Sequence, residues 1–384
     1  MKKILVLGGA GAMANETTRD LVETSDFSEI TVAEIDRQKA LDLVAQLKDR
    51  RLKVTEFNAE SISEMSKIME DCDVVANGLP RIFAKNAIIA AINAKKDILD
   101  LTSPHRETLG LDTKAKAAGI TAVGGVGITP GITNILARLG ADRLDSIEQI
   151  DIDFAAFRSI AHSPALLHVI LWEFDPRTNN RYCFENGKLV PNAPFSGERI
   201  VHFPKPIGTQ ATYYVPHGES QTLSKNIRGV KRVYIRGCFP PMAMRLVRAI
   251  YDYGLYKQKA VSLFELLKAY LLEALEGDQA ELWGYSVQVE VIGRLKARRV
   301  MKRFQTTHPP MEEWGGSRAY DKNVGIPLSI GAQLLGKGRA MKKGVDGVEN
   351  MLPCKEFVEE LKKRGFVISE ELIDLKKSRR AASG

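Results

Sequence analysis

Short apolar runs alternate with amphipathic stretches over about the first 127 residues. KILVLG is apolar over the length of one strand, and NETTRDLVETSDF after it has helical spacing. EITVAEID, RQKALDLVAQLKDR and LKVTEFN then read as a strand, a helix and a strand. Strands that are apolar on both faces and separated by helices are typical of a parallel sheet with right-handed crossovers.

The same rhythm continues as far as Pro130. It predicts further strands at CDVVANGLP, DILDLTS and ITAVGGVG, and helices at SISEMSKIMED, IFAKNAIIAAINA and LGLDTKAKAAG. Strands and helices in this order predict an α/β fold with a doubly wound parallel sheet of the Rossmann type. We assign it to residues 1–130.

After Pro130 the pattern changes. One more helix, GITNILARLGADRL, leads into alternating strands at IEQIDIDFAAF, RIVHFP, KRVYIRG and YSVQVEVIG, with an amphipathic helix, VSLFELLKAYLLEALE, before the last. Alternation predicts a mixed, mostly antiparallel α+β domain at residues 131–324. Residues 325–384 contain helices at IPLSIGAQLLGKG and KEFVEELKKRGF, and we expect this segment to pack back on the first domain.

The composition is that of a globular protein, with 44% hydrophobic and 27% charged residues among 384. Part of the net charge of +8 comes from RLKARRVMKRF, which lacks interleaved aromatic residues and follows an alternating strand. We interpret it as an exposed hairpin tip and expect no nucleic-acid partner. No stretch has the roughly 18 to 20 apolar residues of a membrane span, so we expect no membrane partner and a cytoplasmic protein.

The cysteines give no sign of a metal site or of disulfides. They form no CxxC pair and have no histidine at zinc-ligand spacing, so we expect reduced thiols and no bound metal. They are Cys72, Cys183, Cys238 and Cys354.

The clearest chemical motif lies between the first strand and the first helix. Gly9, Gly11 and Ala14 form a GxGxxA frame, with Ala12 and Met13 inside it. The first glycine permits a tight turn, the second lets backbone N–H groups reach a diphosphate, and the small third residue lets the helix approach the strand. We predict that this loop binds a dinucleotide.

An acid at the end of the second strand supports this prediction. Glu34 is placed to accept hydrogen bonds from the adenosine ribose diol, and Asp36 is the second choice. A carboxylate there repels a 2′-phosphate and favours NAD, while Arg37 just beyond keeps NADP as an alternative.

Other loops at the carboxyl edge of the sheet provide further candidates. Asn77, Gly78 and Pro80 end the fourth strand, where Asn77 either contacts the cofactor or caps the next helix. GGVGITPGITN contains Gly127, Thr129 and Pro130 and leads into a helix. It is compatible with an interdomain hinge, with a helix N-terminus that forms a wall against nicotinamide and an anion site for a substrate carboxylate, or with both roles together.

Candidates for proton transfer and substrate binding are fewer. YYVPHGESQTLSKNIRG places His217 beside Glu219, a pair suited to proton exchange, although a histidine in a loop is also compatible with a structural role. His105 follows the fifth strand as an equal candidate. A cationic clamp for a substrate carboxylate is assigned to Arg158 or Arg228, although both are also compatible with surface positions.

Taken together, the motifs in this order resemble those of the saccharopine dehydrogenase family, particularly its compact lysine 6-dehydrogenase-like members. The resemblance extends over nearly the whole chain. The motifs that carry it are GGAGAMANETTRDL, TVAEID, DVVANGLP, ILDLTS, GGVGITPGITNILA, HGESQTLSKNIRGVKR, GIPLSIGAQLLGKG, GVDGVE and FVEELKKRGFVISE.

The resemblance implies a Rossmann domain, a domain that carries the substrate and forms homodimers, and hydride transfer at a carbon attached to an amino group. It assigns Asp100, Thr102 and Ser103 to the edge of the fifth strand, with Thr102 at the cofactor. Thr129 stands where saccharopine reductases and carboxynorspermidine dehydrogenases usually carry aspartate. This departure bears on those two substrates rather than on the reaction class. Ile35, where NADP-dependent relatives often carry arginine, supports NAD.

Three functional classes follow. The first is an NAD(P)-dependent oxidoreductase acting on the CH–NH or CH–NH2 group of saccharopine, lysine or a related amine. The second is a nucleotide-binding regulatory or scaffold protein without turnover. The third is a dehydrogenase of a hydroxy or carbonyl substrate.

Overall fold

The structure is a computed structural model that describes residues 2–157, 164–178, 180–257 and 284–375. It divides into two compact units. The first consists of residues 1–138 and 321–364, and the second of residues 139–320 and 365–384. The predicted helix VSLFELLKAYLLEALE and the candidate Arg158 lie outside the described residues.

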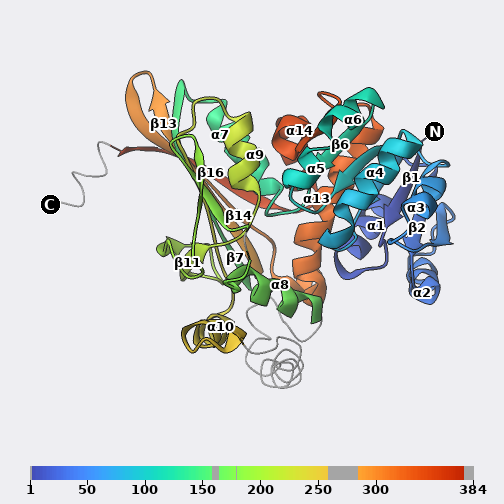
Figure 1. Cartoon of the computed structure of the whole chain (residues 1–384), viewed down its shortest axis with the longest axis horizontal. Helices are drawn as coiled ribbons and strands as arrows, with labels where there is room; N and C mark the ends of the chain where they lie inside the picture. The colour runs from blue at the N-terminus through green and yellow to red at the C-terminus, as the bar shows by residue number, and fades with distance from the viewer. Residues whose placement is uncertain (1, 158–163, 179, 258–283, 376–384) are drawn as a thin grey trace. The chain divides into compact units, whose positions relative to one another are not determined.

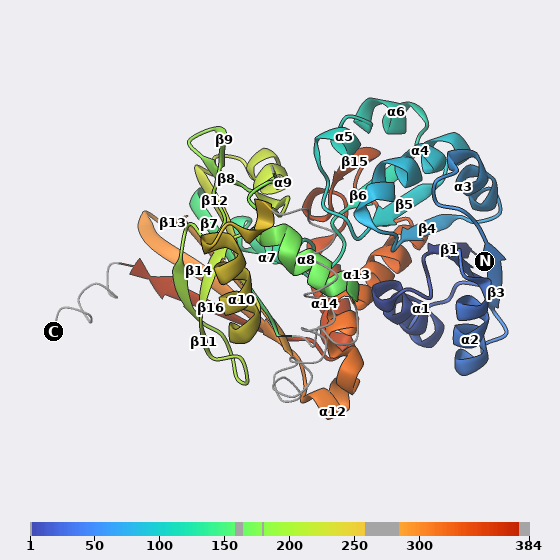
Figure 2. The ribbon, with the colours of Figure 1, turned by 60° about the horizontal axis from the view of Figure 1, so that its bottom comes forward.

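The first unit contains a seven-stranded parallel sheet in the order β15-β6-β5-β4-β1-β2-β3. It confirms the predicted doubly wound α/β fold, with α3 and α4 on one face and α1 and α2 on the other (Figure 2). The strands are β1 (Lys3–Leu7), β2 (Glu29–Glu34), β3 (Leu52–Glu56), β4 (Val74–Asn77), β5 (Asp97–Asp100), β6 (Thr121–Gly124) and β15 (Gly344–Gly347).

A helix follows each of the predicted strands, and the helix after the last one, β6, continues into the second unit. Their ends carry local signals: Asp36 caps α2 by accepting hydrogen bonds from two backbone N–H groups, and Ser61 caps α3. The helices are α1 (Ala12–Thr24), α2 (Arg37–Leu47), α3 (Ile62–Met69), α4 (Ala84–Ala94), α5 (Arg106–Leu109), α6 (Asp112–Ala117), α7 (Ile132–Ala141), α13 (Ala319–Gly336) and α14 (Cys354–Lys363).

The second unit contains a nine-stranded sheet whose main path is β10-β11-β12-β7-β13-β14-β16 (Figure 1). Among the strands that the structure describes in this unit, only β7 and β12 pair in parallel, which confirms the mixed, mostly antiparallel prediction. The strands are β7 (Ser146–Phe157), β8 (Tyr182–Glu185), β9 (Lys188–Pro191), β10 (Arg199–His202), β11 (Thr209–Tyr214), β12 (Arg232–Cys238), β13 (Gly284–Leu295), β14 (Arg298–Thr307) and β16 (Val367–Asp374). The helices are α8 (Pro164–Phe174), α9 (Glu219–Asn226), α10 (Pro241–Asp252) and α12 (Met311–Trp314).

The C-terminal segment 325–384 differs from its predicted course. Helices α13 and α14 were predicted, and β15 adds a seventh strand beside β6. Beyond Arg364, however, the chain belongs to the second unit, because β16 pairs with β14. Strand-to-strand hydrogen bonding therefore makes the end of this segment part of the second sheet.

The basic run RLKARRVMKRF forms the predicted hairpin, but its tip is shorter than expected. Lys296 and Ala297 both have positive φ, which is the geometry of a type I′ turn. Residues from Arg298 onward belong to β14, and Phe304 is buried. The alternation of this strand is obscured in the sequence by its basic residues.

Charged side chains occupy one face of the second sheet. Asp151, Asp153 and Glu290 are at most 4% exposed, yet they extend from neighbouring strands β7 and β13. Arg199 donates to Asp153 over 2.8 Å and also to Glu290, while Arg236 donates to Asp151 over 2.9 Å. Burial without neutralisation would be very unfavourable, so these arginines are required for the face to remain buried.

The hairpin of β10 and β11 covers part of this charged face. Thr212 on β11 donates to Asp153 over 2.8 Å. Beside it, Val201 on β10 and Phe203 just beyond that strand form a small buried cluster with Ala155 and Phe157 of β7. The hairpin thus combines apolar packing with the ion pairs of Arg199.

Candidate functional site

The turn after β1 is shaped by glycine. Gly8 has a φ of +67°, and the N–H groups of Gly8 and Gly9 both donate to the carbonyl of Ala33 on β2. A Cβ on Gly9 would lie 3.0 Å from the carbonyl oxygen of Val6. Thr18 of α1 donates to the carbonyl of Gly9 over 2.9 Å, which fixes the loop against its own helix.

The beginning of α1 is open to an anion. Gly11 is the N-cap and offers no capping side chain, and the first turn contains no acid. Among the described residues, no protein acceptor meets the N–H groups of Ala12, Met13 and Ala14. Free N–H groups and the positive end of the helix dipole fit a diphosphate.

The two acids at and just after the end of β2, Glu34 and Asp36, have different hydrogen-bond partners. Glu34 is buried and its Oε1 accepts from the N–H of Ala10 over 3.1 Å, directly beside the glycine loop. Asp36 instead accepts from the N–H groups of Gln38 and Lys39 at the start of α2. Glu34 therefore fits a ribose diol, whereas Asp36 is occupied as a helix cap.

The end of β4 packs closely on α1. A Cβ on Gly78 would lie 2.4 Å from the Cβ of Ala14, so both positions require small residues. Pro80 precedes a short 3-10 turn at Arg81–Phe83. These backbone approaches explain why small residues stand there, independently of any ligand.

Asn77 neither lies free nor caps the next helix. Its Nδ2 donates to Asp100 Oδ2 over 2.7 Å, and its Oδ1 accepts from the N–H of Leu79 over 3.2 Å. Asp100 also accepts from the N–H of Thr102 over 2.6 Å. The edges of β4 and β5 are thus joined by a buried carboxylate that the motif analysis did not single out for a role of its own.

The beginning of α7 differs from that of α1. Its first two N–H groups donate, over 3.0 and 3.1 Å, to the carbonyls of Gly127 and Ile128. The N–H of Gly131 donates to the side chain of Asn134 over 3.1 Å. These donors are already satisfied, which disfavours the predicted anion site beside Thr129 and favours a purely structural turn.

A residue from the C-terminal segment supports this turn. Asn134 donates to Glu349 Oε2 over 3.1 Å, and Glu349 follows β15. A Cβ on Gly347 would lie 2.4 Å from that carboxylate, so any larger residue there would displace the Glu349 side chain. The motif GVDGVE therefore supplies both a strand and a support for Gly127 and its neighbours.

In the second unit, His217 lies between two buried glutamates. Its Nε2 is 3.2 Å from Glu173 Oε1, its Nδ1 is 3.9 Å from Glu219 Oε2, and its ring stacks on Phe154. Burial lowers the pKa of an imidazole, but the hydrogen bonds and charges of both glutamates outweigh it and raise the pKa of His217 to about 10. His217 is therefore an imidazolium at neutral pH.

Glu173 was missed by the motif analysis. It comes from α8, 44 residues before His217, and no local pattern links the two. Its second oxygen and the hydroxyl of Ser220 are buried without a hydrogen-bond partner among the described residues. The cluster therefore retains polar atoms that a ligand can engage.

His105 has the opposite character. It begins α5, and its Nδ1 lies 3.3 Å from the carbonyl of Ser103. Burial, the largest cause, lowers the pKa of His105 below its ordinary value, so this ring is neutral at neutral pH. Arg228 is exposed in the turn after α9, which agrees with the surface alternative.

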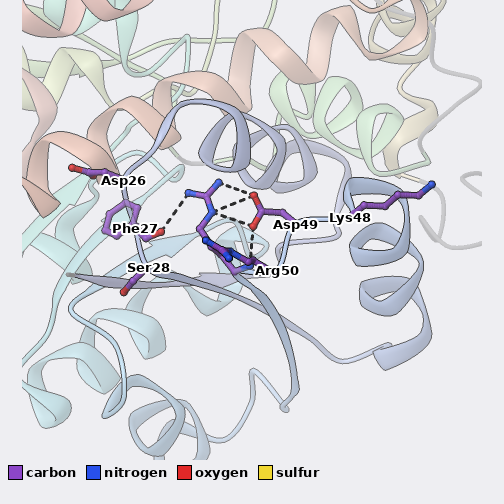
Figure 3. A pocket seen from close by; sticks show the side chains of 7 residues that line it. Asp26, Phe27, Ser28, Lys48, Asp49 and Arg50 are labelled. Carbon is purple, nitrogen blue, oxygen red and sulfur yellow. Dashed lines mark hydrogen bonds and ion pairs between the residues drawn. The ribbon is translucent and has the colours of Figure 1, made fainter.

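A separate pocket lies at the amino ends of β2 and β3 in the first sheet (Figure 3). Asp26, Phe27 and Ser28 line it just before β2, together with the segment from Lys48 to Arg51 before β3. Arg51 donates to the carbonyls of Val22 and Ser25 and thereby completes the end of α1. None of the predicted site residues lines this pocket.

Among the described residues, no helix combines the length and apolar character needed to cross a membrane. No group of three or more His, Cys, Asp or Glu side chains in those ranges is arranged to hold a metal ion.

A doubly wound sheet with a glycine loop, an open first helix and an acid on the second strand defines a dinucleotide-binding protein of the Rossmann class. The chain belongs to the saccharopine dehydrogenase family. Residues 4–123 match the family's NADP binding domain and residues 127–366 match its C-terminal domain. The protein is thus an oxidoreductase of this family that uses NAD(P).

Individual relatives agree with this assignment. Carboxyaminopropylagmatine dehydrogenase of Synechocystis sp. is 22% identical, with 92% of this chain and 94% of the relative covered. Carboxynorspermidine synthase of Vibrio alginolyticus is 23% identical, with 90% and 91% covered. Apo saccharopine dehydrogenase (L-Glu forming) of Saccharomyces cerevisiae has the same fold, with a TM-score of 0.70 at 16% identity over 97% of this chain and 100% of that chain.

Proposed function

We propose that the protein is an NAD(P)-dependent dehydrogenase of a carboxylated amine, acting on the CH–NH or CH–NH2 group of saccharopine, lysine or a carboxylated polyamine. The names of the relatives support this substrate class, since two denote carboxylated polyamines and one denotes saccharopine. The observation that carries the proposal is His217 between Glu173 and Glu219.

The dinucleotide fits the first unit through the protein's own groups. The N–H groups of Ala12, Met13 and Ala14 hold the diphosphate, and Glu34 holds the adenosine ribose. Gly78, Pro80, Thr102, Gly127 and Pro130 are proposed to line the nicotinamide half at the carboxyl edges of their strands. The bound nicotinamide supplies the hydride chemistry.

The acid–base requirement of an amine substrate matches His217. The nitrogen must be uncharged when its carbon is oxidised, and it gains a proton in the reverse direction. An alkylammonium has a pKa of about 10, and the pKa of His217 is raised to about 10 as well. A general acid whose pKa matches its partner exchanges a proton with little cost. Glu173 and Glu219 hold the ring in place for this exchange.

Replacing His217 tests its role directly. We expect His217→Gln to lower kcat for imine reduction by about a hundredfold, because the proton donor is lost. In the native protein the reductive rate should fall as pH rises through about 10, where His217 loses its proton, and the variant should lack this fall. Steady-state rates across a pH series measure both effects.

His105→Gln is the matched comparison. A loss of less than about threefold is expected there if His217 exchanges the proton. A large loss in His105→Gln with an unchanged pH profile in His217→Gln would assign the proton to His105, whose neutral ring is the alternative acceptor.

Replacing Glu34 tests the preference for NAD. Glu34→Ala should lower the ratio of the NADP to the NAD dissociation constant by about tenfold, because a carboxylate that repels the 2′-phosphate is removed. Fluorescence titration with both reduced coenzymes gives this ratio. Asp36→Ala should leave the ratio unchanged and cost about 1 kcal/mol of stability through the lost cap. The opposite pattern would make Asp36 the determinant.

The reaction class is tested by a substrate screen. Amino acids and carboxylated polyamines are incubated with NAD or NADP, and the appearance of reduced nicotinamide is followed by absorbance. Turnover with an amine supports the proposal. Tight coenzyme binding without turnover on any amine would favour the regulatory or scaffold alternative, and turnover only with hydroxy acids or alcohols would favour the third class.

We also propose the homodimer that the family resemblance implies, and the cytoplasm as its compartment. Sedimentation equilibrium tests the former, and fractionation of the source cells tests the latter. A monomer at micromolar concentration would contradict the first proposal.

A further inference from the structure

The carboxylate of Asp100 stands out among the buried charges of the first unit. Asp100 ends β5 and is 3% exposed. Its partners are the amide of Asn77, over 2.7 Å, and the N–H of Thr102, over 2.6 Å. Both partners are neutral, and among the described residues no cation pairs with Asp100.

This isolation is unusual for a buried carboxylate. Burial raises the pKa of Asp100 to about 6, and the hydrogen bonds of Thr102 and Asn77 offset only part of that effect. At about pH 8 the group is therefore ionised despite its burial. The contrast is Asp97, the first residue of the same strand, which pairs with Lys343 and accepts from the N–H of Thr121.

The location of Asp100 gives the charge a possible use. The glycine loop after β1 fixes the diphosphate, and the sheet order changes direction between β1 and β4. In such sheets the ligand lies along the carboxyl ends of the strands on both sides of that point, so the edges of β4 and β5 receive the nicotinamide half. Asp100 lies at this edge, held by the side chain of Asn77.

We propose that Asp100 is an electrostatic determinant of cofactor redox state, a buried uncompensated negative charge that favours the cationic NAD(P)+ over the neutral NAD(P)H. The inference rests on the proposed binding of the nicotinamide half at this edge. The oxidised ring carries a positive charge that the reduced ring lacks, so a fixed carboxylate stabilises only the oxidised form. Asn77 and Thr102 position the carboxylate and keep it ionised.

The scale of the effect follows from Coulomb's law. Two unit charges about 10 Å apart at an effective dielectric constant of about 20 change a binding constant by about tenfold. The quantity to measure is the dissociation constant of NAD+ divided by that of NADH. A residue with a purely structural role would weaken both coenzymes alike and leave this ratio unchanged.

The test uses Asp100→Asn, which removes the charge and keeps the size, with Asp97→Asn as the matched control. Calorimetric titrations at about pH 8 measure the dissociation constants of NAD+, NADH and ADP-ribose for the full chain and both variants. We expect the NAD+ to NADH ratio of dissociation constants to rise about tenfold in Asp100→Asn. The dissociation constant of ADP-ribose should stay within about twofold of the native value. Asp97→Asn should leave the ratio unchanged.

Several results would overturn the inference. One is an unchanged ratio in folded Asp100→Asn, and another is an equal weakening of NAD+ and NADH. Asp100→Ser, which is neutral and smaller, should repeat the shift, and failure of both neutral variants to fold would assign Asp100 to the fold alone. If the native chain binds ADP-ribose but neither coenzyme, the proposed function fails instead.

Discussion

Gly11→Asp should abolish coenzyme binding while leaving the protein folded. Gly11 is the N-cap of α1 with φ −67° and ψ 158°, a conformation that any residue adopts. Aspartate is a favoured N-cap, so the helix itself should not suffer. Its carboxylate would take the N–H groups that the diphosphate needs and would repel that anion. We expect the dissociation constant of NADH to rise by more than about a hundredfold.

The neighbourhood of Gly11 strengthens this expectation. A Cβ there would lie 3.0 Å from the carbonyl oxygen of Gly8 and 3.8 Å from Glu34 Oε1, so the new carboxylate would add a second negative charge beside Glu34. Fluorescence titration measures binding, and thermal unfolding checks the fold. Gly11→Asn is the neutral control of the same size and should bind more tightly than Gly11→Asp. Unchanged NADH affinity in Gly11→Asp would mean that the loop serves another purpose.

The dinucleotide half of the site could be predicted because its signals are local in the sequence. The turn, the first helix and Glu34 lie within a single strand–helix–strand unit, and apolar periodicity places all three. Local signals do not distinguish two roles for Asp36. A carboxylate just before a helix is equally a cap, and the structure shows Asp36 in that role.

The remaining features depend on contacts between distant segments. Glu173 approaches His217 across 44 residues, and Asn134 reaches Glu349 across 215. Strand β15 has only four residues, two of them glycine, and it forms because the edge of β6 accepts it. The anion site expected at α7 is disfavoured by local contacts instead, because the turn at Gly127 satisfies the helix donors itself.

The ion pairs on the charged face of the second sheet could not be predicted from the sequence either. Breaking them has the largest expected effect on stability. Arg199 bonds Asp153 and Glu290, which are 46 and 91 residues away. In Arg199→Met both carboxylates would remain buried, and they would lose their shared cation. Arg236 would stay 3.9 Å from Asp153, and Arg303 would keep its 2.8 Å contact with Glu290. Removing one partner of a buried ion pair costs about 3–5 kcal/mol, so we expect the free energy of unfolding to fall by about that amount.

Denaturant unfolding at equilibrium measures this loss, with Arg177→Met as the control. Arg177 pairs with Asp175 over 2.6 Å, but its side chain is 55% exposed, and such surface pairs contribute about 0–1 kcal/mol. Adding Asp153→Asn to Arg199→Met should recover part of the stability, because the buried charge that lost its nearest arginine is then removed. A loss no larger than that of Arg177→Met would show that the ion pairs of Arg199 contribute little to holding the hairpin of β10 and β11.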